Sequence, residues 1–252
     1  KMTLFEALTA AKQKIDRLDA RLLLQYATGC THTDILARPE TPVIEPARAQ
    51  FAEWVERRAA GEPLAYLVGE AEFRGRVFQV SPAVLIPRPE TEVLIDLAVE
   101  NLSALPSPKV LDLGTGSGIV AISLALEYPA AEMVAVDVSK DAIFVARNNA
   151  GRLAAKVDFR QGDWFAPVIG ERFDLIVSNP PYIAEGDPHL ELNGLPFEPR
   201  LALTDQEPSG DGLACIRHIV AHAAAHLKPG GWLLFEHGYD QGPASRNLLT
   251  AA

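Results

Sequence analysis

From residue 90 onward, short apolar runs of strand length alternate with longer amphipathic stretches that have helical spacing. This alternation restricts the fold to a parallel sheet whose strands are joined by right-handed helical crossovers. The region therefore predicts a doubly wound α/β domain. Strands are expected at residues 110–113, 133–137, 157–160, 174–178 and 232–236, and helices at about 90–103, 117–128, 139–151 and 212–227.

The first 68 residues have a different pattern. Apolar residues recur at helical spacing near the N-terminus, between Asp16 and Gly29, and from Phe51 to about Gly61. Three prolines between the last two stretches indicate a loop. We therefore expect a small helical domain at residues 1–68.

A connector is expected between the two domains, at residues 69–89. Residues 72–80 alternate in polarity around Gly75, which predicts a short β-hairpin. Three further prolines restrict the following backbone to an extended path. The α/β domain should then span residues 90–252.

Charge and cysteine usage narrow the function classes. The 252 residues carry a formal net charge of −10, with 33 acidic and 23 basic side chains. Such a balance disfavours broad binding to nucleic acid, although a local basic patch remains open. Cys30 and Cys215 have no metal-like spacing, and no apolar run reaches the length of a membrane span. A cytoplasmic monomer with reduced thiols is expected, without a membrane anchor or specific nucleic-acid binding.

The segment from Asp112 to Gly118 lies between a predicted buried strand and a predicted helix. Its glycines allow a sharp turn and close approach to a ligand, and the following helix offers unpaired N–H groups. The spacing is G-x-G-x-G, with an acidic residue two positions earlier, rather than the G-x-G-x-x-G of dinucleotide enzymes. This pattern resembles the cofactor loop of Rossmann-like methyltransferases, and the resemblance implies that the loop cradles the amino-acid part of S-adenosylmethionine. The loop residues expected to contact that cofactor are Gly114, Thr115, Gly116, Ser117 and Gly118.

Acidic residues follow the next two predicted strands. Asp137 lies about 20 residues beyond the glycines, where an acid accepts hydrogen bonds from ribose hydroxyls in this class of fold. Asp163 could bind the adenine amino group, and Trp164 could cover the adenine ring. A core position for Trp164 beneath the loop is an equally good interpretation.

Asn179-Pro180-Pro181-Tyr182 follows the fourth predicted strand, at the sheet edge where ligands bind. Two prolines give a rigid segment whose carbonyls are free to accept hydrogen bonds. The side-chain oxygen of Asn179 and the carbonyl of Pro180 could each accept one hydrogen of a substrate NH2 group. Tyr182 could stack on the planar group, so that alignment provides most of the acceleration.

The acceptor is therefore expected to be a planar amide or amine nitrogen. We assign catalysis to Asn179, Pro180 and Tyr182, substrate binding to all four residues of the segment, and a further cofactor contact to Asn179. The motif alone also suits an adenine-N6 or guanine-N2 nucleic-acid methyltransferase, which the acidic balance disfavours. A non-catalytic dinucleotide-binding module is a third reading, opposed by the G-x-G-x-G spacing.

Several other side chains allow more than one interpretation. His218, His222 and His226 repeat every fourth residue, which favours a solvated helix face over a metal site. Arg88 and Glu90 could orient the connector over the cofactor or pair at the surface. The loop containing Glu198 and Arg200 could form a lid over the substrate or a simple surface loop.

Taken together, the motifs resemble the HemK/PrmC family of protein-(glutamine-N5) methyltransferases, which act on peptide chain release factors. The resemblance covers nearly the whole chain. Asn-Pro-Pro-Tyr is shared with other methyltransferases, whereas the connector motif is much more specific. The segments that carry the resemblance are Ile86-Pro87-Arg88-Pro89-Glu90-Thr91-Glu92, Asp112 to Gly118, Ser178 to Tyr182 and Glu236-His237-Gly238.

This resemblance implies a substrate, the glutamine of the Gly-Gly-Gln motif in class 1 release factors. It implies that the N-terminal helices recognise the release factor and that Asn179 to Tyr182 hold the glutamine amide. One departure concerns the end of the sequence. Sheets of this type usually finish with an antiparallel hairpin, and no such segment follows the helix expected near Leu248, so we expect that a C-terminal tail is missing from this sequence.

Overall fold

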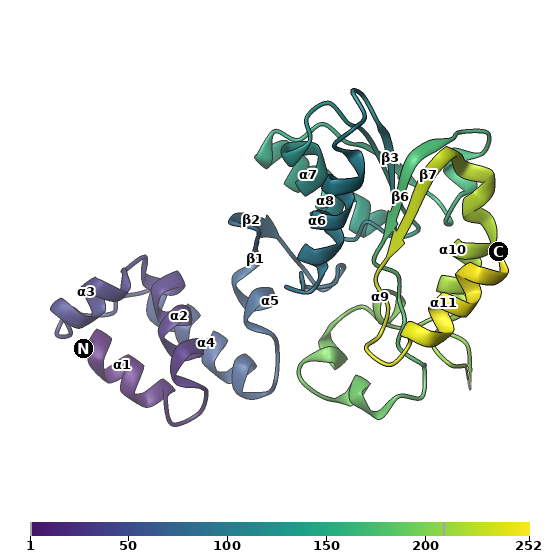
Figure 1. The fold of residues 1–252 in the computed structure, drawn as a ribbon. Coiled ribbons are helices and arrows are strands. Elements are labelled where there is room, and N and C mark those ends of the chain that lie inside the picture. Colours follow the sequence, from purple (N-terminus) through teal and green to yellow (C-terminus); the bar gives the residue numbers. More distant parts are fainter. Residues whose placement is uncertain (1, 209) are drawn as a thin grey trace. The chain divides into compact units, whose positions relative to one another are not determined.

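The computed structural model describes residues 2–208 and 210–252 (Figure 1). The chain divides into two compact units, Lys1–Gly69 and Glu70–Ala252. Among the described residues, no helix is long and apolar enough to cross a membrane.

The N-terminal unit is helical. Thr3 and Glu6 form a capping box at its first helix, Asp16 caps the second, and Gly29 ends the second in a left-handed conformation. Leucines of these two helices pack with apolar residues of the fourth in a buried core. The helices are α1 (Leu4–Ala11), α2 (Arg17–Thr28), α3 (His32–Ala37), α4 (Ala47–Ala59) and α5 (Leu64–Val68).

Two of these helices, α3 and α5, were not expected from the sequence. Each spans fewer than two turns, so neither shows a repeating apolar pattern. The capping box of Thr31 and Asp34 was the local signal for α3, and Pro63 before α5 was the signal for the other.

The second unit begins with the predicted β-hairpin. Strands β1 (Glu70–Phe73) and β2 (Arg76–Gln79) pair antiparallel around Arg74 and Gly75, whose φ angles are +50° and +70°. Two consecutive positive φ angles suit the tight twist of a two-residue hairpin turn. Phe73 and Phe78 are buried and pack edge to face in the main core of this unit.

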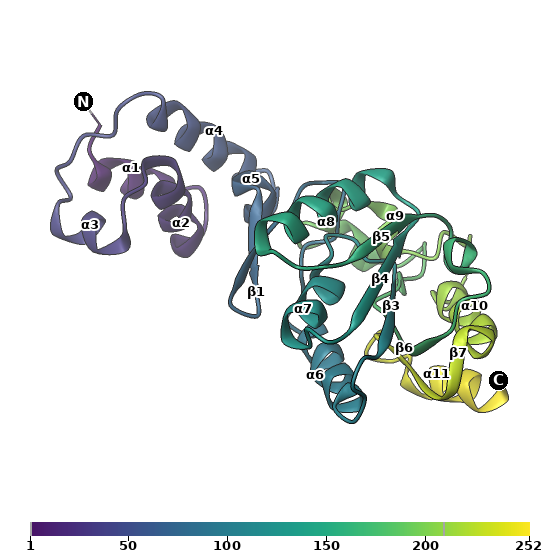
Figure 2. The ribbon, with the colours of Figure 1, turned by 90° about the horizontal axis from the view of Figure 1, so that it is seen from above.

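The sheet of the second unit has the order β5-β4-β3-β6-β7, and all its neighbouring strands are parallel. The chain leaves β3 toward one edge and then returns to place β6 on the other side of β3 (Figure 2). Ligands of open α/β sheets bind at such a switch point. The strands are β3 (Lys109–Leu113), β4 (Glu132–Asp137), β5 (Asp158–Gln161), β6 (Phe173–Ser178) and β7 (Leu227–Phe235).

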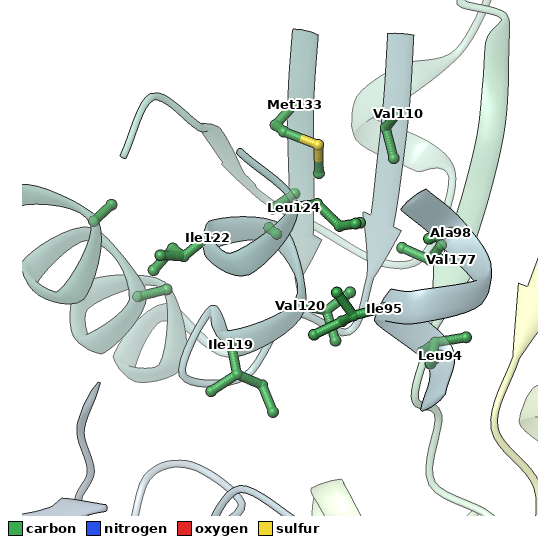
Figure 3. Close-up of a cluster of buried hydrophobic side chains, with 14 of the residues drawn as sticks. Leu94, Ile95, Ala98, Val110, Ile119, Val120, Ile122, Leu124, Met133 and Val177 are labelled. Carbon is green, nitrogen blue, oxygen red and sulfur yellow. The ribbon is translucent and has the colours of Figure 1, made fainter. Parts of the chain in front are cut away.

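Helices cover both faces of this sheet, as the doubly wound prediction requires. On one face, α6 (Thr91–Leu102), α7 (Ile119–Glu127) and α8 (Lys140–Leu153) bury apolar residues against the strands (Figure 3). On the other, α10 (Ala214–Ala223) packs Ile219 and Ala223 against the sheet. The final helix, α11 (Gly242–Ala251), lies beside α10 (Figure 1).

The predicted boundaries near the end of the chain were wrong. The helix expected at 212–227 ends at Ala223 and continues as one 3-10 turn, Ala224–His226. The last strand begins at Leu227, five residues earlier than expected. This part of the strand was missed because it contains Pro229, Gly230 and Gly231, residue types that are uncommon inside strands. Its pairing with β6 is irregular between Phe173 and Leu175.

Candidate active site

The glycine loop connects β3 to α7 at the carboxyl end of the sheet. Gly114, Gly116 and Gly118 have φ angles of +71°, +55° and +85°, which L side chains rarely adopt. The N–H groups of Gly114 and Thr115 both donate to the carbonyl of Val136, at 2.9 and 3.0 Å. The loop is therefore anchored to the end of β4.

Gly118 serves the packing of helices. A Cβ atom at this position would lie 2.8 Å from Ile122 Cδ1 and 3.2 Å from Ala146 Cβ. A Cβ atom at Gly114 or Gly116 would have no heavy atom within 4 Å apart from those of its chain neighbours. The absence of a side chain at Gly118 therefore allows α7 and α8 to approach closely.

Asp112 lies fully buried beneath the loop. Its carboxylate accepts a 2.8 Å hydrogen bond from the Thr115 hydroxyl and a further one from the backbone N–H of Ala121. Desolvation outweighs these bonds and raises the pKa of Asp112 to about 7. A cation bound nearby would be stabilised by the ionised form of this group.

Asp137, at the end of β4, accepts hydrogen bonds from the N–H groups of Gly116, at 2.8 Å, and Ser139, at 2.9 Å. Burial raises the pKa of this carboxyl, and the two backbone bonds oppose the rise. Asp137 thus helps to shape the glycine loop, a role that sequence reasoning did not assign to it.

These groups lie around one cavity, whose volume of about 340 Å³ is within the usual range for small-molecule sites. Its walls come from the connector, the glycine loop, the ends of β4 and β5, Asn179, Pro181 and the segment from Pro199 to Gln206. Of the residues expected to contact the cofactor, those that line this cavity are Gly114, Thr115, Gly116, Ser117, Asp137, Asp163, Trp164 and Asn179. Gly118, Pro180 and Tyr182 are absent from the described lining residues.

The sequence left two interpretations of Trp164 open, and its contact with an adenine ring stays a prediction. It lines the cavity, and it also packs against the apolar cluster under the sheet. Its φ angle is +43°, a conformation uncommon for a bulky side chain. Asp163 beside it is exposed.

Asn179 and Tyr182 take part in a hydrogen-bond network at the end of β6. The Asn179 amide nitrogen donates to Thr91 Oγ1 at 3.3 Å, and the Thr91 hydroxyl donates to Glu236 Oε2 at 2.8 Å. The Tyr182 hydroxyl donates to Glu236 Oε1 at 3.0 Å. Burial and the adjacent Glu236 carboxylate raise the pKa of Tyr182, so this phenol remains protonated.

Sequence reasoning gave Thr91 and Glu236 no role at the site. A signal was available, because Glu236 directly follows β7, and β7 lies next to β6 in the sheet. Side chains that follow neighbouring parallel strands meet at the same edge. The start of α6 brings Thr91 to this edge from 145 positions earlier, which no local pattern indicates.

Arg88 pairs with Glu198 rather than with Glu90. The Arg88 guanidinium donates to Glu198 Oε1 at 2.5 Å, and the side chain of Glu198 is only 3% exposed. Arg200 pairs with Glu185 within the same loop. Glu198 thus connects the loop that follows Tyr182 to the connector.

The histidine stripe is only partly the solvated face that the spacing suggested. His222 is exposed, whereas His218 and His226 are partly buried. The ring of His226 stacks on Phe165 at 4.6 Å, and that of His218 lies 6.0 Å from Trp164. Aromatic packing therefore accounts for much of the stripe.

Comparison with known families defines the class of protein. The family model "Methyltransferase small domain" matches residues 91–193, and "PrmC N-terminal domain" matches residues 3–69. A solved methyltransferase from Pyrococcus furiosus aligns over 79% of this chain and 87% of its own, with TM-score 0.51 and 18% identity. A Thermus thermophilus 16S rRNA N2 G1207 methyltransferase, solved with AdoMet and guanosine, aligns over 72% and 44%, with TM-score 0.52 and 24% identity. The second unit thus has a Rossmann-like methyltransferase fold.

Curated relatives extend this similarity over almost the whole chain. The release factor glutamine methyltransferase of Burkholderia pseudomallei is 50% identical over 245 residues, which is 94% of this chain and 85% of that protein. The enzyme of the same name from Escherichia coli K12 is 44% identical, covering 94% and 84%. The chain belongs to the release factor glutamine methyltransferase family.

Proposed function

We propose that this protein transfers a methyl group from S-adenosylmethionine to the side-chain amide nitrogen of a glutamine, that of the Gly-Gly-Gln motif in class 1 peptide chain release factors. Membership of the family supports the substrate. The observation that carries the chemistry is the orientation of Asn179. Its NH2 group is engaged by Thr91, so its oxygen is left to accept from an acceptor amide.

The lining of the cavity suits the cofactor. Ser117 lines the cavity, and its buried hydroxyl has no hydrogen-bond partner among the described residues, as expected where a polar group of a ligand completes the site. Asp137 offers acceptors for ribose hydroxyls, Trp164 a surface for an adenine ring, and the buried carboxyl of Asp112 a counter-charge for a cation. When bound, S-adenosylmethionine supplies an electrophilic methyl group.

The protein's own contribution is alignment. Asn179 Oδ1 and the Pro180 carbonyl accept the two amide hydrogens, and Tyr182 limits the tilt of the planar group. The amide nitrogen held by these residues would take the methyl group as its bond to the cofactor sulfur breaks, and S-adenosylhomocysteine would be the leaving group. The methylated nitrogen releases one proton to water. Because an N-protonated amide is strongly acidic, no strong general base is required.

The partner and location follow from this proposal. The N-terminal unit, residues 1–69, is assigned to recognition of the release factor, which its match to the PrmC N-terminal domain supports. The methyltransferase unit begins with the hairpin and connector. We place the protein in the cytoplasm, where release factors meet the ribosome.

Peptide mass spectrometry tests the proposal. The protein is incubated with S-adenosylmethionine and an unmodified class 1 release factor. One added methyl on the Gly-Gly-Gln glutamine is expected, with loss of the product in Asn179→Ala. Asn148→Ala is the matched control, because Asn148 is exposed on α8 and does not line the cavity. Methylation of oligonucleotides but not of the release factor would refute the proposal.

A further inference from the structure

The polar network around Asn179 has a defined direction. Thr91 is fully buried at the start of α6, and its hydroxyl has a single hydrogen. A carboxylate can only accept, so the 2.8 Å contact with Glu236 Oε2 uses that hydrogen. Thr91 Oγ1 is then able only to accept from Asn179.

This direction determines which end of the Asn179 amide faces the substrate. The nitrogen of the side chain must lie against Thr91, at 3.3 Å, because the reversed amide would place two oxygen acceptors against each other. The oxygen of Asn179 consequently faces away from Thr91. Only in that orientation can it accept a hydrogen from an acceptor NH2 group.

The carboxylate of Glu236 also binds Tyr182, the residue proposed to stack on the planar acceptor group. Glu236 Oε1 accepts from the Tyr182 hydroxyl at 3.0 Å. The backbone N–H of Glu236 donates to the carbonyl of Ser178 at 3.0 Å, which fixes the carboxylate beside the Asn-Pro-Pro-Tyr segment. The side chain of Glu236, which directly follows β7, therefore positions both ends of the segment, Tyr182 directly and Asn179 through Thr91.

We propose that Thr91 and Glu236 are positioning residues for methyl transfer, which relay hydrogen-bond direction from a carboxylate to the Asn179 amide and so keep its oxygen toward the acceptor nitrogen. This inference rests on the proposed function, in which Asn179 holds the acceptor amide. Neither residue needs to touch the substrate.

A positioning role can be distinguished from simple support of the fold by substitutions that reverse the direction of a hydrogen bond while the side-chain volume stays nearly constant. In Glu236→Gln, the new amide can donate to Thr91 and accept from Tyr182. The Thr91 hydrogen is then released toward Asn179, whose amide turns over and presents NH2 to the substrate. We expect kcat to fall roughly 10- to 100-fold, with S-adenosylmethionine affinity and thermal unfolding close to those of the unaltered protein.

Two substitutions of Thr91 form a matched pair of variants, one without the hydroxyl and one with it. Thr91→Val removes the hydroxyl at nearly constant volume, and Thr91→Ser retains it. The valine variant should lose kcat to a similar extent, and the serine variant should recover most of it. Equal losses in both variants would indicate packing alone and would overturn the inference.

The decisive experiment reverses the direction of the relay. Asn179→Asp alone places an acceptor against Thr91 Oγ1, so activity should be very low. In Asn179→Asp with Glu236→Gln, Thr91 donates to Asp, and the second carboxylate oxygen faces the acceptor. The double variant should exceed Asn179→Asp by roughly tenfold in kcat.

Relief of charge repulsion between two carboxylates would also favour the double variant, and Thr91→Val distinguishes the two causes. If the relay passes through the hydroxyl, adding Thr91→Val to the double variant abolishes the recovery. Recovery that persists without the hydroxyl would overturn the inference, as would no recovery at all. A release factor left unmethylated by the unaltered protein would instead refute the proposed function itself.

Discussion

The carboxylate of Glu198 accepts a 3.0 Å hydrogen bond from the backbone N–H of Ile86. It also pairs with Arg88, two residues further on. Ile86 and Arg88 line one part of the cavity, and the residues that follow Glu198 line another. A single buried side chain thus joins two walls of the site that are 112 positions apart in sequence.

Removing this carboxylate should loosen the cavity. Glu198→Ala leaves the Ile86 N–H without its acceptor and Arg88 without its partner. We expect the free energy of unfolding to fall by about 2 to 3 kcal/mol and S-adenosylmethionine to bind several-fold more weakly. Denaturant titration and calorimetry measure the two effects. Glu191→Ala, at an exposed position of the same loop, should change neither; equal effects in both variants would contradict this view.

Gly212 offers a test of how tightly the Asn-Pro-Pro-Tyr segment is confined. A Cβ at Gly212 would lie 2.4 Å from the Tyr182 carbonyl oxygen and 2.9 Å from the Ala184 nitrogen, both backbone atoms. Gly212→Ala should therefore displace the segment and lower kcat about tenfold or more.

Gly230→Ala is the control for that substitution. Its φ angle of +78° matches the +79° of Gly212, but no atom lies within 4 Å of its ideal Cβ. It should cost about 1 to 2 kcal/mol of stability from backbone strain and leave kcat unchanged. Similar kcat values in the two alanine variants would show that the close approach to Tyr182 is unimportant.

Asp112 should make cofactor binding depend on pH. Its pKa in the ligand-free protein is raised to about 7, and a cation bound in the cavity lowers the pKa of a nearby carboxyl. Binding of S-adenosylmethionine then releases a proton, so affinity should rise as the pH increases toward about 7 and level off above it. Calorimetry in buffers of different ionisation enthalpy measures the proton directly. Asp112→Asn should lose most of this dependence, and an unchanged profile would exclude Asp112 as its source.

Alanine substitutions at two glycines of the loop should differ in their effects on unfolding free energy and on cofactor affinity. Gly118→Ala combines a positive φ with contacts to Ile122 and Ala146, so we expect a loss of about 2 to 3 kcal/mol in unfolding free energy. Gly114→Ala carries backbone strain alone and should cost about 1 to 2 kcal/mol. Cofactor affinity should respond in the opposite order, since Gly114 lines the cavity. Denaturant titration and calorimetry on both variants provide the comparison.

The sequence predicted most of the fold because its signals were local. Periodicity located the strands, and the hairpin turn at Gly75 was evident from its neighbours. The glycine loop and Asn179 could be placed at one sheet edge, because carboxyl ends of parallel strands converge there.

The partners of these motifs could not be predicted in the same way. Thr91 reaches Asn179 from 88 positions away, and Arg88 reaches Glu198 from 110. Both contacts depend on how α6 and the loop after Tyr182 pack, which is determined by tertiary structure rather than by spacing. The sequence allowed Arg88 and Glu90 either to orient the connector over the cofactor or to pair at the surface, and in the structure Arg88 pairs with the distant Glu198.

The cavity takes its walls from residues as far apart as Ala83 and Cys215, so only a piece of chain that spans at least residues 83–215 contains all of the lining. Ligand binding and cooperative folding are therefore linked. Any molecule held only by the folded state raises the free energy of unfolding by an amount that grows with the logarithm of its concentration. The supply of cofactor in a cell thus becomes one of the determinants of how long this protein survives proteolysis.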